Sequence, residues 1–263
     1  MESGSPALPI EHEARQGTGD LQVLSPRPGG PAERLARLLD GVHPAAVFVA
    51  ALIAGFAVVA ALSIGLGLLV TEVLLSSGGL AADDLSVVET IVAERSPFLT
   101  DASDVGGIVG SYVLSAIAAL VAIFFAFRRE WGIAAFAAFV PFVESAIYRV
   151  TSMAVPRERP DVIRLEDLPA DASYPSGHVA ASVAVYGGLV LVLGSRIVDA
   201  TARRFAWAAA ILIPAFVALS RMYQGMHHPL DVTGGVLVGL AAIVIVAFAC
   251  RSAAAASTRR SMY

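Results

Sequence analysis

Six long apolar runs, separated by short polar segments, dominate this sequence and limit the folds open to it. Crossing the hydrocarbon core of a bilayer takes about 20 apolar residues in a helix. Lipid offers no partner for backbone N–H and C=O groups, so spanning segments must be helices or strands of a closed barrel. The runs predict an all-α polytopic membrane protein with six transmembrane helices in a bundle, at residues 44–71, 105–127, 131–154, 179–195, 205–220 and 232–250.

The composition agrees with a membrane protein. Of the 263 residues, 57% are hydrophobic and 15% are charged, which is too apolar for a soluble domain of this length. With one cysteine, Cys250, no disulfide within the chain is possible. Residues 1–13 lack the cationic stretch and apolar core of a cleaved signal peptide, so we expect the first run to act as an uncleaved anchor.

The segments outside the spans divide the chain into three parts: an N-terminal tail over 1–43, a six-span domain over 44–250 and a C-terminal tail over 251–263. Residues 1–30 are rich in Pro, Gly, Ser and charge, which predicts disorder because little apolar surface is available for burial. Residues 31–43 place leucines on one helical face, which favours a short juxtamembrane helix; a solvated lead-in to the first span remains open.

A segment of about 30 residues connects the first two runs and carries its own helical pattern. Asp84 is a candidate cap for a helix that stops before Pro97, with Leu85, Val88 and Ile91 on one side. We expect an amphipathic helix at the outer membrane interface, with a plain connector as the alternative.

All 18 basic residues are arginines, and their distribution predicts the orientation of the bundle. Cytoplasmic loops of membrane proteins carry an excess of arginine and lysine. Arginines gather in the tail, in the loops after the second and fourth spans, and at the C-terminus. These segments are therefore expected to be cytoplasmic, in a multi-pass protein of the plasma membrane. The pattern is broken on the extracytoplasmic side at Arg149, Arg157, Arg159, Arg164 and Arg221.

Those exceptions surround three polar clusters, which the six-span count places on the same extracytoplasmic face. The clusters are Arg159-Pro160, Pro175-Ser176-Gly177-His178, and Ser220-Arg221 with His227 and Asp231. Guanidinium groups bind two oxygens of a phosphate at once, so Arg159 and Arg221 are candidate phosphate ligands. Ser176 and Gly177 precede the fourth span, where the N–H groups of a helix N-terminus favour an anion.

Two histidines are candidates for the chemistry. His227 and Asp231 are four residues apart at the start of a helix, a spacing that puts them on one face. A carboxylate on one ring nitrogen fixes the tautomer and leaves the other nitrogen free as a nucleophile. His178, at the top of the fourth span, is placed to protonate a leaving oxygen as a general acid. The His and Asp spacing lacks a convincing metal-ligand set, and the nearby arginines would repel a cation, so no metal is expected.

These clusters resemble the signature of the type 2 phosphatidic acid phosphatase superfamily, which reads Lys-x6-Arg-Pro, Pro-Ser-Gly-His and Ser-Arg-x5-His-x3-Asp. The second and third parts are complete here, and the likeness covers roughly residues 105–250. The resemblance implies a metal-independent phosphatase that forms a phosphohistidine and needs no cofactor. It implies the nucleophile His227 with its partner Asp231, the acid His178, and phosphate ligands at Arg159, Ser176, Gly177 and Arg221.

The first part of the signature is incomplete, because Ser152 stands where the family has lysine. Arg149 lies three residues earlier on nearly the same helical face and is a further candidate phosphate ligand; Arg157 is another. A snorkelling role for Arg149 at the interface also remains open. Glu144 is an ionisable group inside the third span, open to pairing with Arg149, to capping a kink, or to catalysis.

The sequence therefore predicts a membrane lipid phosphatase that hydrolyses a lipid phosphate or diphosphate, of the isoprenoid diphosphate or phosphatidic acid type, at the outer membrane face. Its expected partners are that lipid and the surrounding membrane lipids, with no nucleic acid; the oligomeric state is open. Two alternatives are a phosphotransferase that uses the same intermediate and a lipid-binding or transport protein with a degenerate site.

Gly235 and Gly239, four apart, indicate a close contact between helices.

Overall fold

The computed structural model describes residues 23–261, and its regular structure there is helical apart from one isolated bridge between Arg157 and Ala172. The segments are α1 (Pro31–Leu38), α2 (Pro44–Leu68), the π-helical η1 (Leu69–Leu74), the 3-10 η2 (Leu75–Ser77), α3 (Gly79–Ala93), α4 (Pro97–Val109), α5 (Tyr112–Phe127), α6 (Trp131–Ala154), α7 (Gly177–Ser182), the π-helical η3 (Val183–Gly187), α8 (Gly188–Leu193), the 3-10 η4 (Gly194–Arg196), α9 (Ala200–Tyr223) and α10 (Pro229–Arg260).

The apolar runs coincide with helical segments. Within the described residues, five are long and apolar enough to cross a membrane: Pro44–Leu74, Pro97–Phe127, Trp131–Ala154, Ala200–Tyr223 and Pro229–Arg260. Gly177–Leu193 is a shorter apolar helix. The all-helical, multi-pass membrane fold is therefore confirmed, whereas a count of six spans stays a prediction.

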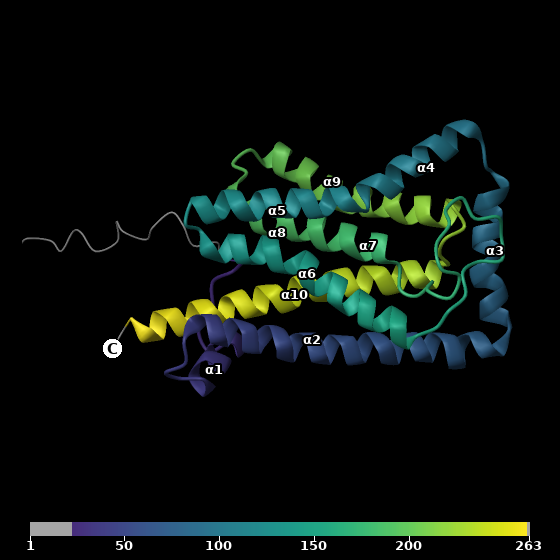
Figure 1. Ribbon diagram of the computed structural model, residues 1–263. Coiled ribbons are helices and arrows are strands. Elements are labelled where there is room, and N and C mark those ends of the chain that lie inside the picture. The colour runs from purple at the N-terminus through teal and green to yellow at the C-terminus, as the bar shows by residue number, and fades with distance from the viewer. Residues whose placement is uncertain (1–22, 262–263) are drawn as a thin grey trace, which may run out of the picture.

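Helix α10 lies inside the bundle, where it packs against α2, α6 and α7 (Figure 1). Helices surrounded by lipid gain little from hiding apolar surface from one another, so close packing of small residues stabilises their contacts. A Cβ atom added at Gly235 would lie 2.5 Å from the carbonyl oxygen of Ser176, and one added at Gly239 would lie 2.6 Å from that of Ala180. The predicted close helix contact is confirmed, and it places the start of α7 beside the start of α10.

The two ends of the bundle differ (Figure 1). One end carries α1 and the last turns of α10, joined by a small apolar cluster of Ala36, Val47, Ala255 and Ala256. Residues 23–30 pack at this end, where Leu24 is buried and Arg251 Nε donates to the Val23 carbonyl at 2.7 Å. Disorder was predicted for residues 1–30; residues 1–22 lie outside the described residues, whereas residues 23–30 pack against α10. The opposite end, called here the motif end, carries α3, the loop of residues 155–176 and the turn before α10.

The helix expected between the first two spans exists as α3, which lies across the motif end in Figure 1. The role predicted for Asp84 is wrong, because Gly78 is the N-cap residue of α3 and Asp84 lies within the helix. Its side chain is buried and forms an ion pair with Arg157. A buried carboxylate needs a cation or several donors, and the guanidinium of Arg157 supplies them.

Candidate active site

The three polar clusters come together at the motif end through backbone contacts. The Ser176 N–H donates to the Asp231 carbonyl at 2.9 Å, which joins the second cluster to the third. Arg159 Nη1 donates to the Met226 carbonyl at 2.6 Å, which joins the first cluster to the third. His228 caps α10 and Pro229 is its first residue, the helix start predicted from the sequence.

His227 is 4% exposed and is held by the backbone of the preceding loop. Its Nδ1 lies 2.8 Å from the carbonyl oxygen of Ser173. A carbonyl only accepts hydrogen bonds, so Nδ1 carries the proton and the lone pair is on Nε2. Burial lowers the pKa of His227, an effect that Asp231 opposes, and the neutral ring is the form that can act as a nucleophile.

Asp231 does not contact His227 as directly as the sequence suggested, since 3.8 Å separates His227 Nδ1 from Asp231 Oδ2. Oδ2 instead accepts from the Ser173 hydroxyl at 2.6 Å and from the His228 N–H at 2.8 Å. Oδ1 accepts from Arg157. Asp231 therefore orients His227 mainly through Ser173, whose hydroxyl it holds and whose carbonyl holds the ring. Ser173 belongs to no motif, and its place just before Pro175 was the one signal available.

Arg221 is fully buried in the last turn of α9, and a carboxylate occupies its binding face. Its Nη1 and Nη2 donate to Glu166 Oε1 and Oε2 at 2.6 and 3.0 Å, and Nη1 also donates to Gln224 at 2.7 Å. Hydrogen bonding to Arg221 lowers the pKa of Glu166, so this carboxylate is ionised. Glu166 thus holds the two-pronged position in which a guanidinium binds a phosphate. Sequence reasoning missed this residue, which lies in a loop without a periodic pattern.

Arg159 is tied to the loop that surrounds it. Its three nitrogens donate to the carbonyls of Pro169, Met226 and Ala172 at 2.8, 2.6 and 3.1 Å. A guanidinium has five N–H groups, so two remain for a ligand. The backbone fixes the position of Arg159 next to His227 before any substrate binds.

Two buried donors at the site lack partners. In the part of the chain that the structure describes, the only buried side-chain nitrogen or oxygen atoms without a hydrogen bond are Ser176 Oγ and Arg221 Nε. Leaving such a group unpaired costs about 1–3 kcal/mol. Both residues are predicted phosphate ligands, and an anion with several oxygen atoms would satisfy them.

An open cavity of about 770 Å³ adjoins the site, and Glu166, the partner of Arg221, is among its lining residues. Gly177 and His178 line it at α7, and Arg149 lines it from α6. Glu144, five residues before Arg149 on α6, also lines it and accepts a hydrogen bond from Ser145 at 3.3 Å. Among the ion pairs of the described residues, none joins Glu144 to Arg149. Arg149 therefore faces the cavity, whereas Arg157 is held between Asp84 and Asp231.

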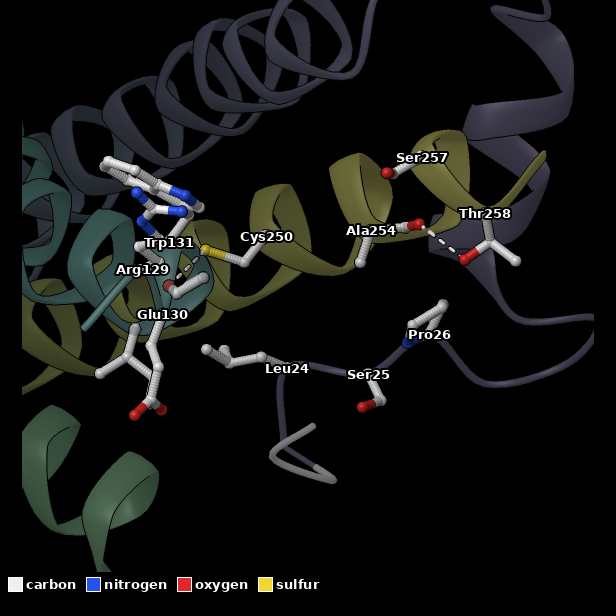
Figure 2. Close-up of a pocket in the computed structure, with 12 residues that line it drawn as sticks. Leu24, Ser25, Pro26, Arg129, Glu130, Trp131, Cys250, Ala254, Ser257 and Thr258 are labelled. Atoms are coloured by element: carbon white, nitrogen blue, oxygen red, sulfur yellow. Dashed lines mark hydrogen bonds between the residues drawn. The ribbon is translucent and has the colours of Figure 1, made fainter. Parts of the chain in front are cut away.

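A second cavity, of about 480 Å³, lies at the opposite end of the bundle and contains none of the motif residues. Figure 2 shows its lining, with Arg129, Glu130 and Trp131 at the start of α6 and Cys250 on α10. Cys250 Sγ donates to the Gly132 carbonyl at 3.7 Å, so the thiol has a structural partner. This cavity offers no nucleophile beside a cluster of donors.

Comparison with known proteins agrees with the geometry of the motif end. The family model described as the PAP2 superfamily matches residues 130–254, which include all three clusters. This part of the chain, just under half of it, is thus similar to the PAP2 superfamily. The fold agrees as well: a PAP2 type phosphatidylglycerolphosphate phosphatase from Bacillus subtilis aligns with a TM-score of 0.60 and 23% identity, over 70% of this chain and 92% of that one.

Two PAP2-like relatives are similar over shorter segments. An undecaprenyl-diphosphatase from Sulfolobus acidocaldarius is 40% identical over 75 residues, which are 28% of this chain and 32% of that protein. A decaprenylphosphoryl-5-phosphoribose phosphatase from Mycobacterium tuberculosis is 34% identical over 122 residues, 45% of this chain and 60% of the relative. The chain thus matches less than two thirds of the length of either protein.

Proposed function

We propose that this protein is a lipid phosphatase that hydrolyses a lipid phosphate or diphosphate through a phosphohistidine intermediate. The observation that carries the proposal is the position of His227, which has a free Nε2 beside two buried donors without partners. The PAP2 superfamily match and the lipid phosphatases among the relatives point the same way.

In the first half of the reaction, His227 Nε2 attacks the terminal phosphorus, a nitrogen–phosphorus bond forms, and the bond from that phosphorus to the leaving oxygen breaks. The leaving oxygen belongs to the lipid alcohol in a monophosphate and to the remaining lipid phosphate in a diphosphate. His178 donates a proton to that leaving oxygen. Charge on the transferred group is stabilised by Arg159 and Arg221, with the Ser176 hydroxyl and the N-terminus of α7 as further donors. The fixed positions of these groups supply most of the catalysis, as in other phosphoryl transfers.

In the second half, a water attacks phosphorus and the nitrogen–phosphorus bond breaks. His178, now without its proton, accepts a proton from that water. Inorganic phosphate leaves and His227 returns to its neutral form.

The substrate proposed is an isoprenoid phosphate or diphosphate, or a phosphatidic acid. The names of two relatives favour the isoprenoid class. The cavity beside His178 runs along the membrane-spanning helices α5 and α6, so a lipid can keep its chain in the bilayer while its phosphate reaches the motif end. We place that end on the extracytoplasmic face of the plasma membrane, with the termini in the cytoplasm, because of the arginine distribution.

The test uses the purified full-length chain in detergent with a panel of these lipids and a chelator present. We expect phosphate release without added divalent metal, and a ³²P label trapped on His227 after rapid quenching of a labelled substrate in alkaline denaturant, because a phosphohistidine is lost in acid. A requirement for magnesium, or transfer of the label to an added alcohol in place of water, would contradict metal-independent hydrolysis.

A further inference from the structure

Arg157 lies between two buried carboxylates at the motif end. Its Nη1 donates to Asp231 Oδ1 and its Nη2 donates to Asp84 Oδ2. The side chains are 7% exposed for Arg157, 3% for Asp84 and 0% for Asp231. Removing three charges from water is costly, so each depends on its contact with the others. Arg157 therefore joins the interfacial helix α3 to the first turn of α10.

Asp84 makes a second contact with the same helix. Its Oδ1 accepts from the N–H of Leu230 at 3.1 Å, in the first turn of α10. The first N–H groups of a helix have no partner within the helix, and a negative charge there is favourable. One side chain of α3 thus holds both Arg157 and the start of the helix that carries Asp231.

These contacts continue as far as the proposed nucleophile. Asp231 Oδ2 accepts from the Ser173 hydroxyl at 2.6 Å, and the Ser173 carbonyl accepts from His227 Nδ1 at 2.8 Å. An unbroken series of hydrogen bonds therefore runs from Asp84 through Arg157, Asp231 and Ser173 to His227. Arg157, Asp231 and Ser173 each use one atom for the preceding contact and another for the next. A displacement of the Asp84 side chain would therefore move the groups that orient the His227 ring.

We propose that Asp84 and Arg157 are a positioning pair for the nucleophile, which keeps Asp231 and Ser173 where they hold the His227 ring. The inference rests on the proposed phosphatase function. Neither residue touches the substrate in this account, and neither belongs to the three motifs. Asp84 lies outside the segment that matches the PAP2 superfamily, so a part of the chain without motif residues helps to set the geometry of the site.

A second anchor of α3 allows this role to be separated from folding. Arg95, just after α3, donates to the Tyr223 carbonyl from Nε and Nη2 at 3.1 and 2.8 Å. It also donates to the Ile163 carbonyl at 2.8 Å. Loss of the Asp84 charge leaves these contacts in place, so α3 stays attached to α9 at its C-terminal end.

The first test compares Asp84→Asn, Arg157→Gln and the double variant with the wild type, in full-length protein acting on phosphatidic acid and on an isoprenoid diphosphate. We expect kcat to fall roughly 10- to 100-fold in each single variant, as for outer-shell partners of other sites, with KM unchanged. The kcat of the double variant should be no lower than that of the single variant with the lower kcat, because both changes break the same series of contacts. Asp83→Asn is the matched control, since Asp83 is the exposed neighbour on the same helix.

The second test follows the His227 ring by NMR of ¹⁵N-histidine-labelled protein, which has five histidines, and needs no turnover. Asp84→Asn removes a negative charge and should lower the pH at which His227 titrates. Arg157→Gln removes a positive charge and should raise it. The other charged groups near the ring, on Asp231, Arg159 and Arg221, are retained in both variants, as is the titratable ring of His178, whose pKa burial lowers to about 4.

Opposite shifts, with kcat reduced and KM unchanged, support the positioning pair. Wild-type kcat in both variants would overturn it, as would shifts in the same direction. A loss of kcat that only follows the loss of folded protein, measured by thermal unfolding in detergent, would also overturn it. If the wild type releases no phosphate from any lipid but the two variants still shift the His227 titration in opposite directions, the proposed function is refuted and the contact series remains supported.

Discussion

Replacing Glu166 with glutamine tests whether its carboxylate occupies the position of the substrate phosphate. Two charge-assisted hydrogen bonds, of 2.6 and 3.0 Å, join it to Arg221. The Arg221 side chain is fully buried, but that of Glu166 is 36% exposed, so solvent screens the pair. Hydrogen bonds to charged groups contribute about 1.5–3 kcal/mol, and after discounting for exposure we assign the whole contact about 1–2 kcal/mol.

A substrate phosphate must displace this carboxylate before Arg221 can bind it. The apparent affinity of the substrate is reduced by the fraction of molecules in which the site is open. A contact of about 1–2 kcal/mol corresponds to a factor of about 5–30, so Glu166→Gln should lower KM by that factor. We expect kcat to change less than KM, since no hydrogen bond in the described residues joins Glu166 to His227 or His178 and only the charge of Glu166 acts on His178.

The assay measures phosphate release against lipid concentration in mixed micelles, together with inhibition by inorganic phosphate. The inhibition constant should fall by the same factor as KM, because phosphate also needs the Arg221 fork. Asp167→Asn is the matched control, since Asp167 is exposed in the same loop. An unchanged or higher KM in Glu166→Gln would refute the reasoning and indicate that Glu166 contacts the substrate.

Four further outcomes are expected. His227→Ala should abolish phosphate release and keep the thermal unfolding temperature, and retained turnover would remove His227 as the nucleophile. The acid limb of kcat/KM against pH should have its midpoint below 6.5, because burial lowers the pKa of His227 in the free protein and its neutral form attacks; a higher midpoint contradicts this. Ser173→Ala removes the hydroxyl bond to Asp231 but keeps the carbonyl, so kcat should fall about 10-fold at constant KM. Arg149→Met should raise KM about 5-fold if its charge meets the lipid phosphate, and an unchanged KM would favour snorkelling.

The helices were predictable from the sequence because the bilayer imposes a long apolar run on each one. Their ends were less so. The second span was expected to begin at residue 105, but its helix begins at Pro97, where the Ser96 hydroxyl accepts from the Leu99 N–H at 3.3 Å. Asp101 and Asp104 lie within that helix, so the longest uncharged run begins only at residue 105. The first charged residues show where a helix leaves the hydrocarbon core, whereas the N-cap residue shows where the helix begins, and the two positions differ here.

The motif residues were predictable as a group, but their partners were not. Ser173, Glu166 and Arg157 all lie in the loop of residues 155–176, which has no hydrophobic period from which a direction could be read. Their roles depend on residues far away in the chain, such as Arg221 for Glu166. The sequence favoured a direct contact between His227 and Asp231, since the spacing of four residues permits it. The loop places the Ser173 carbonyl oxygen closer to His227 Nδ1 than Asp231 Oδ2, so Nδ1 donates to the carbonyl.

The absence of the motif lysine at position 152 can be related to the charge balance at the motif end. Asp84 and Asp231 engage Arg157, and Glu166 engages Arg221. With Arg159, the three guanidiniums match three carboxylates before substrate arrives. When a phosphate displaces Glu166, Arg221 and Arg159 are both available to it, and Arg149 adds a charge along the cavity. We propose that Arg149, which lines the cavity, supplies the charge of the missing lysine, and that movement of Glu166 frees Arg221 and so controls access to the phosphate site.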